Sequence, residues 1–452
     1  MPSCAQEPAC MSKQSAITQA VEIVLLPKPD AWPADLVAPT STHAIQARTQ
    51  LDLPIDHPIV ASGHQPILFH PGIVAKLIAL DYWAKKTGAA PVWIVPDQDI
   101  VDPGLIRIPE QSGGSLTAED IRLGGEQNHQ SPAAILPPIP INADLYDRLE
   151  PVGSWLMGYE QESSLARQFA SATIGMLCEQ LDLEEPTIIY ASDLLQLEAT
   201  SLLLDGMLND PLAAIHSYNT SVARFPDAGV RPLTMTDTHF ELPFWRLEGN
   251  ARVPVIVQSD QSGFDRTNLI PRGLMMTAIM RAYLCDLFIH GTGGYEYDRI
   301  TEHWLNDWQG RELAPITAAS ATMMLDFDLP TFQDPNQAAW IAHHARHNPA
   351  LLGDQEAAQK KADLVAAIAR SKANGDQLTT SRLFAQLHHL LDETRAKHAG
   401  EIHRLDEAFR IAQQSRESQE IASSRTWAFP LYPDEQLQSL KAEIIRALDS
   451  AE

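Results

Sequence analysis

The chain has 452 residues, of which 44% are hydrophobic and 20% are charged, a composition that predicts folded domains and excludes an intrinsically disordered chain. Its 33 Lys and Arg residues and 58 Asp and Glu residues give a net charge of −25 (33 − 58), which opposes binding to nucleic-acid phosphates. No apolar stretch approaches the roughly 18 to 20 residues of a membrane-spanning helix, so neither a nucleic acid nor a membrane is an expected partner.

Residues 1–20 are polar and rich in small side chains. They lack the apolar core of a secretory signal, so we expect a disordered leader and a cytoplasmic protein. Cys4 and Cys10 lie in this leader, whereas Cys178 and Cys285 lie among apolar residues. Four scattered cysteines indicate neither a disulfide framework nor a zinc site, so we expect the last two to be buried free thiols.

The next segment predicts a strand–helix–strand unit. Residues 21–26 predict an edge strand, and residues 58–62 and 92–95 predict buried parallel strands. A strand, a helix and a parallel strand form a right-handed unit whose ligands bind at the carboxyl ends of the strands. The apolar residues that predict the helix recur at helical spacing: Ile73, Leu77, Leu80 and Trp83.

The segment GHQPILFHPG, residues 63–72, joins the first buried strand to the helix. Its imidazoles, its carboxamide and the N–H groups of a helix N-terminus form an arrangement that binds phosphate or carboxylate. Its two histidines are spaced in a way that is similar to nucleotidyl-transfer enzymes, whose paired histidines hold phosphates. We predict His64 as a catalytic acid or base. The alternative is an ordinary turn whose histidines cap backbone groups. The predicted ligand-binding residues are Gly63, Gln65, His70 and Gly72.

Two carboxylates follow the second buried strand. Asp97 and Asp99 are one residue apart, so on a strand their side chains point the same way. Such a pair can bind an amine, hold Mg²⁺ against a phosphate, or act as a general base, and we predict both as catalytic residues. The alternative is a solvated turn that the aspartates cap.

The middle of the chain predicts a continued core with two insertions, at residues 102–182 and 210–265. The first is rich in Pro and Gly and then helical, which favours a lid over the site, and the second contains a hairpin. Residues 187–191 and 319–325 predict two further core strands.

Residues 271–294 return to the core. Pro271 predicts a helix start, and residues 286–290 predict a strand that ends in a glycine-rich loop. The loop matches neither of the common phosphate-loop or dinucleotide fingerprints. The alternatives are a tight turn with packed glycines and, for Arg272, a surface charge. The predicted ligand-binding residues are Arg272, His290, Gly291, Thr292, Gly293 and Gly294.

Residues 331–424 change in texture, because Gly and Pro become scarce and Ala, Gln, Glu and Leu dominate. We expect two long helices with a turn at residues 374–376, forming an antiparallel coiled-coil hairpin that dimerises. Residues 425–452 contain an aromatic and proline-rich anchor followed by a helix, and we expect them to dock on a core spanning residues 21–330.

Three motifs resemble, in the same order, those of the cysteine-adding enzymes of bacillithiol synthesis. That family has Thr-Gly-Gln-Gln and then Leu-Phe-x-Gly-Pro, where this chain has SGHQ (62–65) and LFHPG (68–72). It has a strand ending in Phe-Trp and then Glu-Asp-His-Asp, where this chain has PVWIVPDQD (91–99). It has an Arg-Pro helix, a strand and Gly-Gly-x-Gly-Glu, where this chain has PRG (271–273) and FIHGTGG (288–294).

The resemblance implies an α/β fold with a Rossmann-like, nucleotidyltransferase-type parallel sheet and a C-terminal helical coiled coil that forms a homodimer. It also implies a ligase that joins cysteine to the amine of glucosaminyl malate by an amide bond. ATP or ADP is the expected cofactor, with Mg²⁺ as a candidate ion, and no residues are predicted as protein ligands of a metal. Two alternatives stay open: a transferase that binds another nucleotide or anionic small molecule, and a non-catalytic coiled-coil dimer.

Overall fold

The computed structural model describes residues 21–112, 114–123, 131–140, 151–258, 263–327, 329 and 334–450. The predicted leader at residues 1–20 lies outside these ranges. The chain forms two compact units. The core unit contains Met1–Arg107, Asp120–Leu325 and Arg425–Glu452, and the helical unit contains Ile108–Glu119 and Asp326–Ser424.

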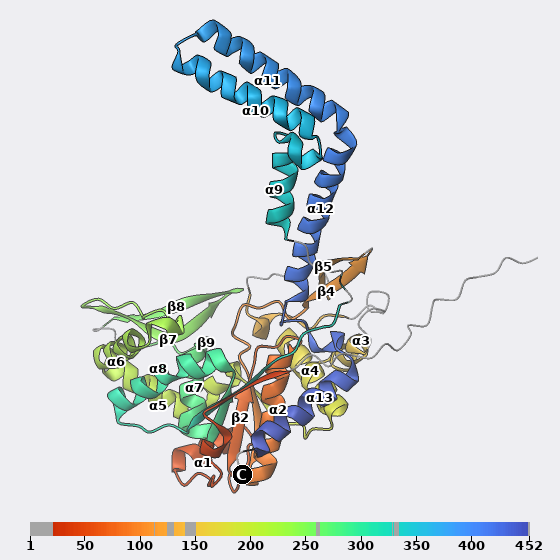
Figure 1. The fold of residues 1–452 in the computed structure, drawn as a ribbon. Helices are drawn as coiled ribbons and strands as arrows, with labels where there is room; N and C mark the ends of the chain where they lie inside the picture. The colour runs from red at the N-terminus through yellow and green to blue at the C-terminus, as the bar shows by residue number, and fades with distance from the viewer. Residues whose placement is uncertain are drawn as a thin grey trace, which may run out of the picture. The chain divides into compact units, whose positions relative to one another are not determined.

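A six-stranded sheet is the centre of the core unit (Figure 1). Its order is β1-β11-β10-β2-β3-β6, with β1 antiparallel to β11 and the other neighbours parallel. The chain builds outward from β2 to β3 and β6, and then returns to the other side of β2 to add β10 and β11. The strand order therefore reverses between β2 and β10, which is where ligands bind in such sheets. The strands are β1 (Glu22–Leu26), β2 (Ile59–Gly63), β3 (Ala90–Val95), β6 (Thr187–Tyr190), β10 (Leu287–His290) and β11 (Ile316–Thr322).

These strands confirm the six strands predicted for this sheet, including the edge position of residues 21–26, although β11 begins three residues before the predicted 319–325. Helices cover both faces of the sheet, which is why its inner strands are buried along most of their length (Figure 1). One face carries α2 (Pro71–Thr87), α4 (Leu165–Leu181) and α13 (Asp434–Asp449), and α3 (Val152–Gly158) packs on α4. The other face carries α1 (Thr42–Gln50), α5 (Glu198–Asn209), α6 (Pro211–Arg224), α7 (Gly273–Ile279) and α8 (Thr292–Gln309).

The two predicted insertions contain smaller sheets. The first includes a hairpin of β4 (Leu105–Ser112) and β5 (Ser115–Arg122). The second contains the predicted hairpin, formed by β7 (His239–Glu248) and β8 (Ala251–Gln258), and β9 (Leu269–Pro271), which follows the insertion, pairs with β7 to complete an antiparallel sheet. The predicted helix start at Pro271 is wrong, since this proline ends β9 opposite Phe244 and α7 begins two residues later. A proline is tolerated there because β9 is an edge strand.

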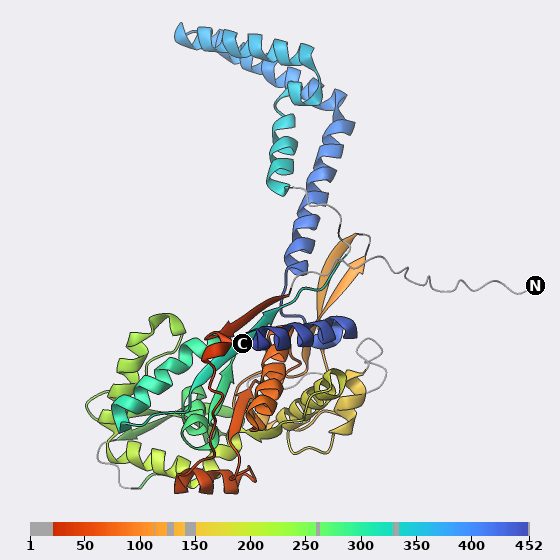
Figure 2. The ribbon, with the colours of Figure 1, turned by 60° about the horizontal axis from the view of Figure 1, so that its bottom comes forward.

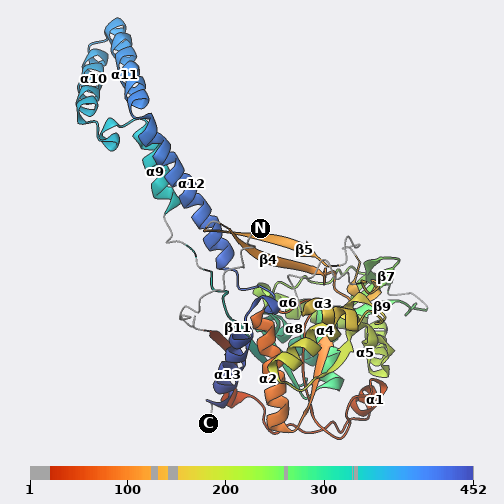
Figure 3. The same cartoon turned by 90° about the vertical axis from the view of Figure 1, so that its right-hand side faces the viewer.

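The described residues of the helical unit form four α-helices, not the two predicted: α9 (Pro335–Ala345), α10 (Gln355–Ala373), α11 (Gln377–Lys397) and α12 (Ala399–Ala422). α10 packs against α11 and α9 packs against α12 (Figure 3). The predicted turn at residues 374–376 is confirmed, with Gly375 at a φ of 71°. A short turn from Pro349 to Gly353 separates α9 from α10. This break was not predicted because Pro and Gly are scarce in the segment as a whole. The coiled coil and the homodimer stay predictions.

The last segment packs on the core unit. Trp427 and Phe429 are fully buried, and the Phe429 N–H donates to the Phe69 carbonyl at 2.7 Å. α13, in dark blue, then lies beside the orange α2 (Figure 2). Cys178 and Cys285 are buried free thiols, as predicted. Within the described ranges, no helix has the length and apolarity that a membrane span needs.

We expect Gly63→Ala to lower the stability of the protein by about 3 kcal/mol, the upper end of the cost of overpacking. A Cβ at Gly63 would lie 2.1 Å from the Ile94 carbonyl oxygen, so β2 and β3 would have to separate. Gly293→Ala is the matched control, because no atom lies within 4 Å of its added Cβ and alanine favours a helix. Thermal denaturation measures both variants, and a Gly63→Ala protein as stable as the wild type would contradict the packing of β2 on β3.

Candidate functional site

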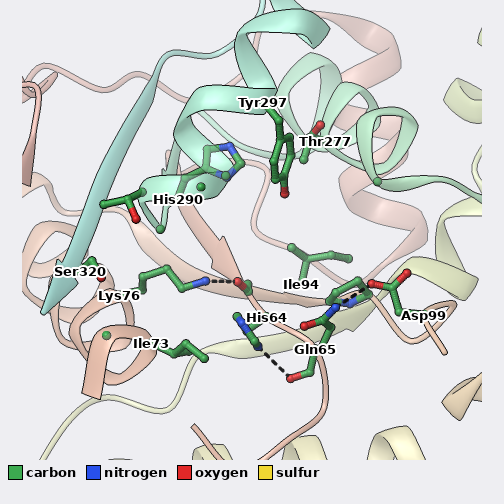
Figure 4. Close-up of a pocket in the computed structure, with 18 of the residues that line it drawn as sticks. His64, Gln65, Ile73, Lys76, Ile94, Asp99, Thr277, His290, Tyr297 and Ser320 are labelled. Atoms are coloured by element: carbon green, nitrogen blue, oxygen red, sulfur yellow. Dashed lines mark hydrogen bonds between the residues drawn. The ribbon is translucent and has the colours of Figure 1, made fainter. Parts of the chain in front are cut away.

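A cavity of about 460 Å³ lies where the strand order reverses, at the carboxyl ends of β2, β3, β10 and β11 (Figure 4). Most residues predicted for a site line it, although the chain brings them from segments more than 200 positions apart. Two of them, Asp97 and Arg272, do not. The predicted residues that line the cavity are Gly63, His64, Gln65, His70, Gly72, Asp99, His290, Gly291, Thr292, Gly293 and Gly294.

Three helices begin at this cavity. The first turns of α2, α7 and α8 contribute lining residues, among them Gly72, Gly273 and Gly294. Backbone N–H groups in a first turn have no partner within the helix, and the helix dipole is positive there. The prediction of a glycine-rich loop at residues 291–294 is wrong. Gly291 is the N-cap of α8 with a φ of −81°, and residues 292–294 form the first turn of the helix. The cavity is surrounded by positive helix ends that favour an anion.

His70 and His64 are neutral donors at this site. His70 is the N-cap of α2, and its Nδ1 accepts the Gly72 N–H at 3.1 Å, so its ring proton is on Nε2. Burial, together with the charges of Lys76 and Arg425, lowers the pKa of His70 to about 4. Burial also holds the pKa of His64 well below its usual value. Both rings therefore stay uncharged at pH 7.

Lys76 is the residue that the sequence prediction missed. It lies on α2 one turn after Gly72, is 5% exposed, and its Nζ donates to the Gly63 carbonyl at 2.5 Å. No carboxylate of the described residues forms an ion pair with it, and burial lowers its pKa to about 7. The sequence did contain a signal for it: Lys76 is a charged residue among the apolar residues of α2, one helical turn after the GHQPILFHPG segment. An ammonium held in a cavity without a charged partner favours an anionic ligand.

His290 belongs to a buried hydrogen-bonded network on the opposite wall (Figure 4). Its Nε2 lies 2.9 Å from Oδ2 of Asp298, a carboxylate that is fully buried on α8. Asp298 also accepts from Thr277 Oγ1 at 2.6 Å and from Arg281 Nη1 at 3.1 Å. The hydrogen bonds from His290 and Thr277, with the charge of Arg281, hold the pKa of Asp298 far below its usual range against the effect of burial.

Asp99 lies at the other end of the cavity and is the only carboxylate among the described lining residues. Its Oδ2 accepts from Gln65 Nε2 at 3.0 Å, and its Oδ1 lies 3.2 Å from Arg252 Nη1. The neighbouring Gln98 is buried, and its Oε1 has no hydrogen-bond partner in the described part of the chain. This end therefore offers acceptors, which suit a ligand amine.

Asp97 does not share this end with Asp99. β3 ends at Val95, and the chain then turns, with the Asp99 N–H donating to the Pro96 carbonyl at 3.3 Å. The prediction that both carboxylates point the same way assumed an extended strand, and it is wrong for that reason. Asp97 accepts instead from the Ser192 N–H at 3.0 Å and the Ser192 hydroxyl at 2.6 Å, and burial raises its pKa to about 6.

Arg272 is also occupied away from the cavity. Its Nη2 lies 2.8 Å from Oε1 of Glu241, and its guanidinium lies 3.7 Å from the centre of the Trp245 ring. It joins the β7 sheet to the start of α7, a structural role that its position before a helix did not reveal.

The described residues contain no group of three or more His, Cys, Asp or Glu side chains arranged to hold a metal ion. A comparison of the chain with models of known protein families finds no match, and a comparison with curated proteins finds none either.

We expect Lys76→Met to raise the melting temperature at pH 7 by roughly 2 °C or more. The folded state lowers the pKa of Lys76 from 10.5 to about 7, so the charged form opposes folding. This penalty is complete below pH 7 and disappears as the pH rises toward 10.5, because the unfolded chain then loses the same proton.

The stability gap between Lys76→Met and the wild type should therefore shrink by pH 9.5. The matched control is Lys85→Met on the same helix, whose ammonium is half-exposed and pairs with Asp81 at 2.6 Å, and it should not raise stability. A Lys76→Met protein less stable than the wild type at pH 7 would show that Lys76 has a structural role.

Proposed function

We propose that this chain is a carbon–nitrogen ligase that binds ATP or ADP at the reversal point of a Rossmann-like sheet. The observation that carries this proposal is the set of donors around one cavity: three helix N-termini, the unpaired ammonium of Lys76 and the neutral ring of His70. In a chain with a net charge of −25, such a lining is selective for an anion.

A phosphate-bearing ligand suits these donors better than a lone carboxylate. The N-termini of α2 and α8 reach the cavity from different strands, so they can hold more than one anionic group. Mg²⁺ would be held mainly by the phosphates, because the described lining offers it one carboxylate, Asp99.

Amide formation is supported by the chemistry of the two ends of the cavity. A carboxylate reacts with an amine only after activation, and ATP activates it by transfer of a phosphoryl or adenylyl group. The helix N-termini and Lys76 would stabilise the phosphate that leaves, and Asp99 with Gln98 would hold the amine. The resemblance to the bacillithiol enzymes makes cysteine and glucosaminyl malate the first substrates to test.

A non-catalytic dimer is the rival reading, since α9 and α11 expose apolar side chains such as Trp340 and Leu378. Such a dimer would not need an unpaired cation in a cavity, which is why the ligase is the proposal that the site favours.

Calorimetric titration with ADP at pH 7.5 tests the binding. We expect Lys76→Met to weaken the affinity at least tenfold, about 1.4 kcal/mol, because it removes the buried cation. Lys85→Met should bind as the wild type does, since its side chain faces solvent. The wild-type affinity should fall between pH 7 and pH 9, because Lys76 loses its proton there.

Equal ADP affinities in Lys76→Met and the wild type would contradict this binding site. Turnover is a separate measurement, with ATP, cysteine and glucosaminyl malate supplied together. ADP binding without amide formation would leave an anion-binding transferase of other substrates, and binding of no nucleotide would favour the non-catalytic dimer.

A further inference from the structure

Asp298 does not line the cavity, yet three side chains hold its carboxylate in place. It is fully buried on α8, and it accepts hydrogen bonds from Thr277, Arg281 and His290. Arg281, which is 3% exposed, supplies the compensating charge. A buried carboxylate that has an arginine and a hydroxyl as donors needs no histidine to stay ionised, so the contact with His290 calls for a separate explanation.

The contact fixes the proton of His290. An ionised carboxylate can only accept, so Nε2 of His290 carries the hydrogen and donates it to Asp298. Burial, together with Lys76 and Arg281, lowers the pKa of His290 and outweighs the opposite effect of Asp298. The ring is therefore neutral at pH 7, and its lone pair is on Nδ1.

The Nδ1 atom borders the cavity beside Gly294. No hydrogen bond to this nitrogen is present among the described residues, and His290 is a lining residue. A Cβ on residue 294 would lie 2.7 Å from Nδ1, so only a glycine at this position leaves room for the ring beside the first turn of α8. Residue 294 is helical and needs no unusual φ, so backbone conformation does not require a glycine there. The space that the His290 ring occupies does.

We infer that His290 is the general base of the reaction proposed above, and that Asp298 is the positioning residue that aims its lone pair into the cavity. The inference rests on the proposed function for the identity of the reaction, although the geometry of the pair does not depend on it. A histidine whose far nitrogen is held by a buried carboxylate has a fixed tautomer and orientation, which is the arrangement that proton abstraction requires.

The step balances as follows in the proposed ligase. The nitrogen lone pair of a neutral amine attacks the carbonyl carbon of an acyl phosphate made from the substrate carboxylate and ATP. The bond from that carbon to the phosphate oxygen breaks, and its electron pair leaves with the phosphate. The amine proton moves to Nδ1 of His290, which later releases it to the phosphate or to water.

Carbethoxylation of the intact protein with diethyl pyrocarbonate tests the inference, because the reagent attacks the unprotonated nitrogen of a neutral imidazole. Peptide mass spectrometry then gives the rate at each histidine. We expect His290 to react in the wild type. Asp298→Asn should lower that rate several-fold, because a neutral amide no longer supplies the negative charge that makes Nδ1 of the paired ring nucleophilic. The exposed His389 is the internal control and should keep its rate.

Gly294→Ala is the second variant, and it keeps the test decisive where Asp298→Asn fails to fold. It leaves Asp298 and His290 unchanged and places a methyl group against Nδ1, so the reaction at His290 should again be lost. No reaction at His290 in the wild type, or an unchanged rate in either folded variant, overturns the inference.

ADP titration of the same proteins separates the two proposals. A reactive His290 in a protein that does not bind ADP would keep the His290–Asp298 pair and refute the nucleotide site. An unreactive His290 in a protein that binds ADP would keep the nucleotide site and refute the general base.

Discussion

The hydrogen bond from the buried ammonium of Lys76 to the Gly63 carbonyl is the interaction on which the site depends. It joins α2 to the end of β2 and places a positive charge in the cavity, where no carboxylate of the described residues forms an ion pair with it. Such a charge costs stability unless a ligand compensates it. The helix N-termini around it act in the same direction, so the fold concentrates positive potential at one point of a strongly acidic chain.

The sheet order explains why these groups meet. β2 and β10 are neighbours in the sheet although more than 200 residues separate them, and the helix after each strand starts at the same edge. α2 and α8 lie on opposite faces of the sheet, so their N-termini approach the cavity from two sides. Lys76 and His290 then lie on facing walls, one supplying charge and the other a fixed lone pair (Figure 4).

Much of this architecture follows from local sequence patterns. The strands, α2 and the GHQPILFHPG segment were predictable because apolar runs and breaking residues act over a few positions. Lys76 and Asp298 were not, because each lies in a helix where a charged residue ordinarily faces solvent, and only the packing of distant elements buries them. The predictions for Asp97 and Arg272 were wrong for the same reason, because their partners Ser192 and Glu241 come from other parts of the chain. α1 and α6 were missed as helices of the core.

The most direct test is a crystal structure of the full chain with pyrophosphate, a probe that carries the charge of a nucleotide without its base or sugar. The site described here requires pyrophosphate density within hydrogen-bond distance of Lys76 Nζ and of backbone N–H groups in the first turn of α2 or α8. Clear density elsewhere on the molecule, with Lys76 still bonded only to Gly63, would contradict an anion site at the reversal point of the sheet.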